Sequence, residues 1–593
     1  MQDRGNGSAA VRRVALAAIL LVAAAARVAY ALQIRSGPLG AQHRWAETDM
    51  AYFDAWGGRI AAGDLLSRHV APPLHEWHLL VAEAYRARYP HDAVPPEGGL
   101  APDASLWDRW AGRGRFYQEP LYAYLLGGVY ALFGREALAP IAIQLVLGVV
   151  AIGLLVRGTE LLLGADVALV AGGIAALYAP LLYFEGLLLR ESLIVLAGFA
   201  LLLAALRARS AGSVRAWLGC GAVLGLAICL KSHFALFGIG LAAVGLGGSP
   251  RGSNGRRLGA FALGVALALA PLAARNAAVG SPLLSTSSMG GINFLLGNAR
   301  DPGADVTDFR ASHFAPIVHA TEGRFLATVA ATVRTHDGPL GWLALLARKL
   351  DRSLHGREEA DNASFYASRL EAPVLRALPF TFYALGPLGL AGLVLAVPRA
   401  RRIWPLLLLL LTQLAVPVLF FPRDRFRLPF AACLLPFAAL AIVRCWDWAR
   451  CRRWGALALA LGLVGAVALW TGRSLPGGRA PVRPIHYVVP FETYWNPAVL
   501  RLEREGDPAA AADLLGRALR TSRGRLDTIL GTAGPLPEED ADLALFFAGV
   551  RERRAELLAR AGREIEAGEE RARAAALRLA SRRRGSRLPE PPR

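Results

Sequence analysis

The segment that follows the first apolar run carries two carboxylates beside several aromatic residues. It reads ETDMAYFDAWGGRIAAGD and begins with Glu47 and Asp49. A helix that begins near Thr48 would put Asp49, Tyr52 and Trp56 on one face. A carboxylate whose pKa is raised by a partly desolvated membrane surface can act as general base for a hydroxyl or amine acceptor. The same acids equally suit a helix N-terminus, where the macrodipole favours negative charge.

Further acids stand at the ends of other apolar runs. In RFYQEPLYAYLLGGVYALFG, Gln118 and Glu119 come directly before Pro120. In LYFEGLLLRESLIVLAG, Arg190 and Glu191 lie between two apolar runs, where ionised groups are costly unless they are paired or functional. Glu191 is therefore a site candidate, whereas Arg190 can instead extend its guanidinium to the membrane surface.

Basic residues in similar positions suggest an anionic ligand. Lys231 interrupts a long uncharged stretch in CLKSHFALF, at the tip of a tight hairpin. FPRDRFRLPF supplies Arg425 and Arg427 on the predicted outer side, against the usual excess of basic residues on the cytoplasmic side. Arginine binds phosphate oxygens through two donors, so a lipid phosphate or pyrophosphate suits these residues. Anchoring to lipid headgroups is the alternative.

Other ligand classes find less support. Arg275, in PLAARNAAVG at a predicted membrane exit, is a candidate for substrate contact. No phosphate-cradling glycine loop of Walker or Rossmann type indicates a nucleotide-sugar donor. Glu47 and Asp49 alone are weak evidence for a divalent cation, so a divalent metal is possible but not required, and we assign no metal ligands. The five cysteines show no zinc spacing and no disulfide framework.

The composition requires a bilayer around these residues. Of the 593 residues, 54% are hydrophobic, and the mean hydropathy is +0.37, well above that of a soluble globular protein. The formal net charge of +20 resides largely in short loops and in the C-terminal tail. No aromatic-basic motif indicates a nucleic-acid partner, and membrane lipids are the expected surroundings.

The arginine clusters predict a topology when they are placed in the cytoplasm. They give about 11 transmembrane helices with a cytoplasmic N-terminus and a non-cytoplasmic C-terminal domain. The first outer loop covers residues 33–118, and a large late outer loop covers 276–380. Residues 120–134 offer only about 15 apolar positions and are expected to form an interfacial helix. The alternative is that this segment spans and a neighbour does not.

The composition changes beyond Trp470. Residues 1–471 are therefore interpreted as the transmembrane domain and 472–580 as a helical C-terminal domain. In NPAVLRLEREGDPAAAADLLGRALR, leucine and alanine recur at helical spacing on both sides of a Gly-Asp-Pro break. This pattern is similar to half-repeats of tetratricopeptide type, although only one or two units are present. Residues 581–593 are expected to be a disordered tail.

The order of these motifs resembles the membrane-embedded glycosyltransferases of the GT-C superfamily. The similarity is to family 39-like enzymes, the bacterial relatives of protein O-mannosyltransferases and of the lipid A aminoarabinose transferase. It covers most of residues 12–445 and rests on ETDMAYFDAWGGRIAAGD, YQEPLYAYLLGGVYALFG, LLLRES, CLKSHF, the RN and GN turns, and RFRLPF. The C-terminal domain lies outside it.

The resemblance implies roles for particular residues. It makes Asp49 the catalytic residue, as a general base or as a group that orients the acceptor. Glu119 stands where the aminoarabinose enzymes have a lysine, so the local charge is reversed. The remaining implied substrate-binding positions are Glu47, Tyr52, Glu191, Lys231, Arg425 and Arg427.

The function that follows is transfer of a hexosyl or pentosyl group from a polyprenyl-phosphate donor to an acceptor on the non-cytoplasmic side of a bacterial inner membrane. The acceptor, whether protein, lipid or glycan, is left open. The polyprenyl phosphate would leave toward basic residues that stabilise its growing charge. The alternative is a non-catalytic transporter or scaffold for lipid-linked glycans, for which internal repeats and charges near the bilayer midplane are expected.

Overall fold

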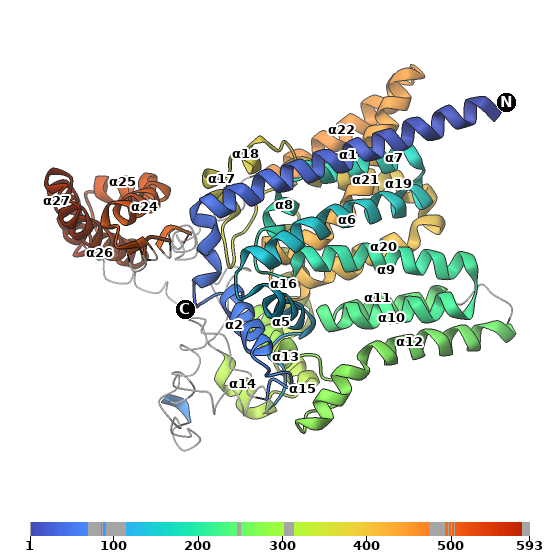
Figure 1. Ribbon diagram of the computed structural model, residues 1–593, viewed down its shortest axis with the longest axis horizontal. Coiled ribbons are helices and arrows are strands. Elements are labelled where there is room, and N and C mark those ends of the chain that lie inside the picture. Colours follow the sequence, from blue (N-terminus) through green and yellow to red (C-terminus); the bar gives the residue numbers. More distant parts are fainter. Residues whose placement is uncertain are drawn as a thin grey trace. The chain divides into compact units, whose positions relative to one another are not determined.

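Every named element in the described part of the chain is a helix, which confirms the all-α class (Figure 1). The computed structural model describes residues 2–68, 85, 87–89, 114–245, 251–301, 313–473, 491, 493–495, 497–499, 501–502 and 505–583. The chain divides into two compact units. Unit 1 comprises Met1–Leu32, Ala46–Glu359 and Val374–Arg473, and unit 2 comprises Gln33–Trp45, Ala360–Pro373 and Ser474–Arg593.

Within the described residues, seven helical segments are long and apolar enough to cross a membrane. They belong to α1 (Gln2–Ser36), α6 (Leu138–Leu163), α9 (Glu191–Ala211), α12 (Arg251–Ala278), the run formed by α19 (Phe382–Ala396), η4 (Val397–Arg399) and α20 (Ala400–Leu419), α21 (Asp424–Arg450) and α22 (Trp454–Gly472). Shorter apolar helices are α5 (Leu121–Phe133), α7 (Ala165–Ala176), α10 (Val214–Leu230) and α11 (Phe234–Gly245). The chain is a polytopic membrane protein; the count of about 11 spans stays a prediction.

The long helices of unit 1 pack as a bundle in which α6, α9, α10 and α12 follow one another (Figure 1). Glycines set the closest approach. A Cβ at Gly221 of α10 would lie 2.0 Å from the carbonyl oxygen of Phe261, and one at Gly264 of α12 would lie 2.1 Å from that of Leu218. Small residues let helix backbones approach in membranes, where packing rather than the hydrophobic effect drives association.

A buried ion pair ties α1 to the bundle. Arg27 Nη2 lies 2.6 Å from Glu185 Oε1 at the end of α8 (Ala179–Glu185), and the two side chains are 4% and 0% exposed. A Cβ at Gly148 of α6 would overlap the Glu185 carboxylate, so α6 needs a glycine there. Pairing makes two charges tolerable at this depth.

Two helices follow the first span. The predicted helix near Thr48 is confirmed, because α2 runs from Asp49 to Ala61 and Thr48 Oγ1 caps it by accepting from the Ala51 N–H at 3.2 Å. It packs against α5, and Asp54 fastens the two helices by accepting from Tyr130 Oη at 2.7 Å. Residues 121–133 are helical as predicted, while their interfacial position stays a prediction.

The late loop of unit 1 is also helical. Its elements are α13 (Met289–Asn298), α14 (Phe314–Thr321), α15 (Phe325–Val333) and α16 (Gly338–Ser353), followed by α18 (Pro373–Ala377), which spans the boundary of the two units. Asn298 organises this region: its side-chain amide donates to the carbonyl of Leu419 at 2.7 Å, and its Oδ1 accepts from Lys349 Nζ at 3.2 Å. The late loop is thereby fastened to the end of α20.

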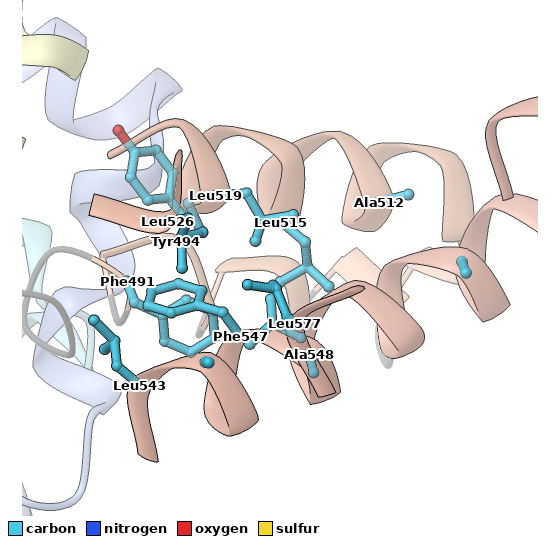
Figure 2. Packing of buried hydrophobic residues seen from close by; sticks show 14 of the residues in the cluster. Phe491, Tyr494, Ala512, Leu515, Leu519, Leu526, Leu543, Phe547, Ala548 and Leu577 are labelled. Carbon is cyan, nitrogen blue, oxygen red and sulfur yellow. The ribbon is translucent and has the colours of Figure 1, made fainter. Parts of the chain in front are cut away.

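Unit 2 is assembled from three chain segments. Its core joins Phe491 and Tyr494 to helices α24 (Pro508–Thr521), α25 (Arg523–Gly531), α26 (Glu538–Arg560) and α27 (Glu564–Ser581) (Figure 2). The Gly-Asp-Pro break is confirmed as a helix start, since Asp507 caps α24 through the Ala510 N–H at 2.9 Å. The tetratricopeptide-like assignment stays a prediction, and residues 584–593 of the predicted tail lie outside the described residues.

The other two segments contribute η1 (Pro38–Arg44) and α17 (Phe365–Glu371) to unit 2. Gln42 Nε2 lies 3.4 Å from both Ser368 Oγ and Thr493 Oγ1, and Tyr494 Oη donates to Glu371 at 2.8 Å. Composition alone marks only the residues after 471, because the two short segments interrupt a sequence that is otherwise membrane-spanning.

Candidate active site

Five helix ends bring charged side chains together at one end of the unit 1 bundle, here called the cluster end. Asp49 begins α2, Glu119 precedes α5, Arg190 caps the start of α9, Lys231 caps the end of α10, and Arg425 lies in the first turn of α21. Spans that follow one another run in opposite directions, so the start of α9 and the end of α10 must lie at the same end of a bundle.

Asp49 is buried, with 4% of its surface exposed, and both carboxylate oxygens are engaged. Oδ1 accepts a hydrogen bond of 2.6 Å from Gln118 Nε2, and Oδ2 pairs with Arg425 Nη1. Hydrogen bonds to charged groups are shorter and stronger than neutral ones, so the two partners fix the plane of the carboxylate.

Glu119 holds the second half of the cluster. Its Oε2 lies 2.7 Å from Arg190 Nη1 and 3.7 Å from Lys231 Nζ, while Oε1 accepts from the backbone N–H and the hydroxyl of Ser232 at 3.0 and 2.7 Å. Burial by itself would raise the pKa of Glu119, but the two cations and the Ser232 hydrogen bonds outweigh it and hold the pKa below its ordinary value. Glu119 is therefore ionised at neutral pH.

Arg190 joins the two halves. Its Nη2 donates to Gln118 Oε1 at 2.6 Å while Nη1 holds Glu119, and its guanidinium lies 5.4 Å from the centre of the Phe53 ring. An unbroken chain of contacts thus runs from Arg425 through Asp49, Gln118 and Arg190 to Glu119 and Lys231. Arg190 is 5% exposed and ion-paired, so it does not extend to the surface.

Among the cations in this chain of contacts, Lys231 forms the longest ion pair and is the most exposed. It lies 3.7 Å from its carboxylate, and its side chain is 19% exposed. Burial, together with the nearby Arg190 charge, lowers the pKa of Lys231 to about 8 against the raising effects of Glu119 and Glu191. An ammonium has three N–H donors, so Lys231 can donate a hydrogen bond to a phosphate oxygen as well. The neighbouring His233 instead contacts Gln413 Oε1 at 2.9 Å.

Glu191 and Tyr52 line the same cluster. Glu191 is buried at the start of α9 and interacts electrostatically with Arg425, Arg190 and Lys231. The Tyr52 hydroxyl is buried, and no described residue gives it a hydrogen-bond partner. Burial raises the pKa of Tyr52 far above its ordinary value, with smaller effects from nearby charges, so the phenol stays protonated and can donate a hydrogen bond.

Arg275 lies in a different environment. It donates to the carbonyl oxygens of Leu66, Gly114 and Ser67 at 2.6–2.7 Å, and its guanidinium lies 3.8 Å from the Phe116 ring centre. These contacts fasten residues 66–67, after α2, and Gly114, near the end of the first loop, to the end of α12. The predicted substrate contact stays a prediction, and the observed geometry is that of a structural clamp.

Arg427 forms a second clamp, and Glu47 lies in the turn before α2. Arg427 pairs with Glu358 Oε2 at 2.5 Å and donates to the carbonyl oxygen of Arg357 at 2.9 Å. It therefore holds the late loop against α21 while Arg425, two residues earlier, points to Asp49. Glu47 is exposed in the turn before α2, and its predicted substrate contact stays a prediction.

Sequence reasoning did not select Gln118, Arg190 or Ser232 as site residues. Gln118 and Ser232 are neutral, and only their position beside Glu119 and Lys231 could have drawn attention to them. Arg190 carried a stronger signal, since an arginine beside an acid between two apolar runs needs a partner. No group of three or more metal-ligating side chains occurs among the described residues. The expectation that no metal is required stays a prediction.

Comparison with known proteins bears on the residues just described. Residues 118–274 match the family model of dolichyl-phosphate-mannose-protein mannosyltransferase. The predicted resemblance to GT-C glycosyltransferases is confirmed over that segment. The matched segment includes Gln118, Glu119, Arg190, Glu191 and Lys231, whereas Asp49 and Arg425 lie outside it. No curated protein sequence matches the chain.

Among solved structures, the chain is similar to the oligosaccharyltransferase of Archaeoglobus fulgidus. The apo form aligns at 15% identity and a TM-score of 0.40, over 82% of this chain and 58% of that one. The complex of the archaeal oligosaccharyltransferase AglB from Archaeoglobus fulgidus with an inhibitory peptide and a dolichol-phosphate aligns at 16% identity and a TM-score of 0.33, over 74% and 59%. The chain thus spans less than two thirds of the length of these structures.

Proposed function

We propose that this chain is a membrane glycosyltransferase that moves a sugar from a polyprenyl-phosphate donor to an acceptor on the non-cytoplasmic side of a bacterial inner membrane. The observation that carries the proposal is the buried chain of contacts at the cluster end, where a fixed carboxylate lies near several cations. The match of residues 118–274 to a mannosyltransferase family supports the same chemistry. The sugar and the acceptor, which can be a protein, a lipid or a glycan, remain to be identified by assay.

The proposed reaction is a direct displacement at the anomeric carbon. The acceptor oxygen forms a bond to that carbon while its proton passes to Asp49 and the bond to the phosphate oxygen breaks. A carboxylate oxygen carries two lone pairs, so Asp49 can accept a proton at an oxygen that also accepts a hydrogen bond. The polyprenyl phosphate leaves with the bonding electron pair.

The leaving phosphate gains negative charge as this bond breaks. Lys231 and Arg425 are the proposed groups that stabilise it, because preorganised cations in a site with little water act most strongly on charge that develops in the transition state. A guanidinium carries five N–H donors, so Arg425 can contact a phosphate and Asp49 at the same time. Glu119 and Arg190 hold Lys231 and Gln118 in position.

The test is transfer of radiolabelled sugar in membranes that contain the wild-type chain, Asp49→Asn or Asp54→Asn. The donors are a panel of polyprenyl-phosphate sugars, and total membrane extract supplies the acceptor. Asp54 is a matched control, since it lies on the same helix and also pairs with an arginine, Arg135 at 2.5 Å, but outside the cluster. We expect Asp49→Asn to abolish transfer and Asp54→Asn to retain it.

Two outcomes would count against the proposal. Transfer by folded Asp49→Asn at the wild-type rate would remove Asp49 as the base. Absence of transfer from every donor by the wild-type chain would favour a transporter or scaffold of lipid-linked glycans instead.

A further inference from the structure

Helix α16 has its polar side inward and its apolar side outward. Leu340 and Leu343 are 79% and 51% exposed, and the exposed stripe continues along the helix through Ala344, Ala347 and Leu350. These positions recur at three- and four-residue spacing, so they form one face. The opposite face buries Lys349 and Ser353 together with one apolar residue, Leu345. A helix surrounded by water would have the reverse arrangement.

The buried lysine fixes α16 to the end of a candidate span. Lys349 Nζ donates to the carbonyl oxygen of Phe420 at 2.7 Å and to Asn298 Oδ1 at 3.2 Å. Phe420 directly follows α20, and Arg425 of the charged cluster lies five residues further on. Helix α16 therefore packs against α20 at the cluster end.

Helix α15 repeats the inversion and packs against α16. Thr328 and Thr332 are buried, and Thr332 Oγ1 donates to the carbonyl oxygen of Thr328 at 2.7 Å. Phe325 and Leu326, in contrast, are 53% and 78% exposed. Two successive helices thus turn apolar side chains away from the protein, which indicates that something apolar covers both.

The length and charge of α16 decide how it meets the membrane. With 16 residues that include Arg348, Lys349, Asp351 and Arg352, it is not among the candidate spans, so it must lie along the surface. Arg324, Arg334 and Arg348 are exposed on the same pair of helices. An apolar face bordered by arginines is typical of helices that lie in a bilayer containing anionic lipids.

We propose that α15 and α16 form a lipid-seated pair, whose apolar face lies in the bilayer at the cluster end and whose arginines contact anionic headgroups. The segment after α16 is clamped to the start of α21 by the Arg427–Glu358 pair at 2.5 Å and by the Asp424 N–H, which donates to the carbonyl oxygen of Glu359 at 3.0 Å. Arg352 of α16 pairs with Glu359 at 2.7 Å and so ties the same segment back to α16. The lipid-seated pair therefore sets the height of Arg425 relative to the bilayer. That consequence rests on the proposed function, whereas the lipid contact does not.

The test is nitroxide accessibility in the full-length chain, reconstituted into nanodiscs that contain phosphatidylglycerol. Labels are placed singly by Leu340→Cys, Leu343→Cys and Ala347→Cys, with Asp337→Cys as the water-facing control in the turn between the two helices. Cys445 and Cys451 are replaced by serine beforehand, since the other three cysteines are buried. We expect the ratio of oxygen to nickel-chelate accessibility to be several-fold higher at the three α16 positions than at Asp337→Cys.

Two results would overturn the proposal. A ratio at Leu343→Cys equal to that at Asp337→Cys would place the face in water. Protection from both relaxing agents would mean that protein, including a second copy of this chain, covers it. Because the measurement needs no sugar transfer, it remains decisive even if the proposed enzymatic activity is absent.

Discussion

Replacing Gln118 by leucine tests whether the chain of contacts around Asp49 positions it for chemistry. The substitution keeps the approximate volume but removes both hydrogen bonds of 2.6 Å, one to Asp49 and one from Arg190. Hydrogen bonds to charged groups contribute about 1.5–3 kcal/mol each, so the upper bound for the loss is about 3–6 kcal/mol. Asp49 still pairs with Arg425, and Arg190 still pairs with Glu119. We therefore expect the loss of folding free energy to lie near the lower end of this range.

The kinetic effect should exceed what this loss of stability explains. With the hydrogen bond from Gln118 gone, the Asp49 carboxylate is held less firmly and can rotate while it stays paired with Arg425. Displacement of a reacting group by about 1 Å can lower the rate about 100-fold, and we expect kcat for sugar transfer to fall by about that factor. The KM for the donor should change little, because the phosphate-binding cations are unaltered.

Gln144→Leu provides the matched control. Gln144 is also a buried glutamine with three hydrogen bonds: it donates to the carbonyls of Glu185 and Leu187 at 3.0 and 2.7 Å and accepts from Tyr122. Its loss should lower the thermal midpoint comparably, yet change kcat of the folded protein by no more than about twofold, because its hydrogen bonds go to the segment before α9 and to Tyr122 rather than to Asp49 or Gln118. An equal kcat loss in both variants, or an unchanged kcat in Gln118→Leu, would refute the reasoning.

Two further predictions concern the Lys231 ammonium and the packing of α10 against α12. Because the pKa of Lys231 is lowered to about 8, its ammonium form is lost as pH rises through that value, so kcat/KM for the donor should fall above about pH 8. Lys231→Arg should move that fall to higher pH, and an unmoved profile would assign it to another group. Gly221→Ala should destabilise the protein by about 1–3 kcal/mol or more, since its Cβ would lie 2.0 Å from a backbone carbonyl. Gly219→Ala, with no atom within 4 Å, should be neutral or stabilise by up to about 1 kcal/mol, and thermal denaturation of both variants compares them.

Local patterns were sufficient for the helices and for several candidate site residues. The start of α2 at Asp49 and the start of α24 after Asp507 follow from capping residues that act within a few positions of themselves. Apolar runs similarly predict the spans, because the bilayer demands a fixed length of apolar helix. Lys231 stood out because a charge in such a run is costly.

The arginines show what local sequence patterns cannot predict, which is the partner of each side chain. Arg425 and Arg427 are two residues apart, yet one reaches Asp49 and the other Glu358. The sequence predicted phosphate binding equally for both arginines. Only the packing of the late loop against α21 shows that they have different partners. Arg275 likewise forms its contacts with carbonyl oxygens, which carry no signature in the side-chain sequence.

The sequence by itself determined that the chain is helical, that it inhabits a membrane, and that charged residues mark the ends of its spans. These properties depend on composition and on spacings within single helices. The tertiary structure decided that Gln118 links Asp49 to Arg190, that α15 and α16 face outward with apolar side chains, and that unit 2 draws on three segments. Such contacts join residues as far apart as Asp49 and Arg425, 376 positions along the chain, and only folding brings them within bonding distance.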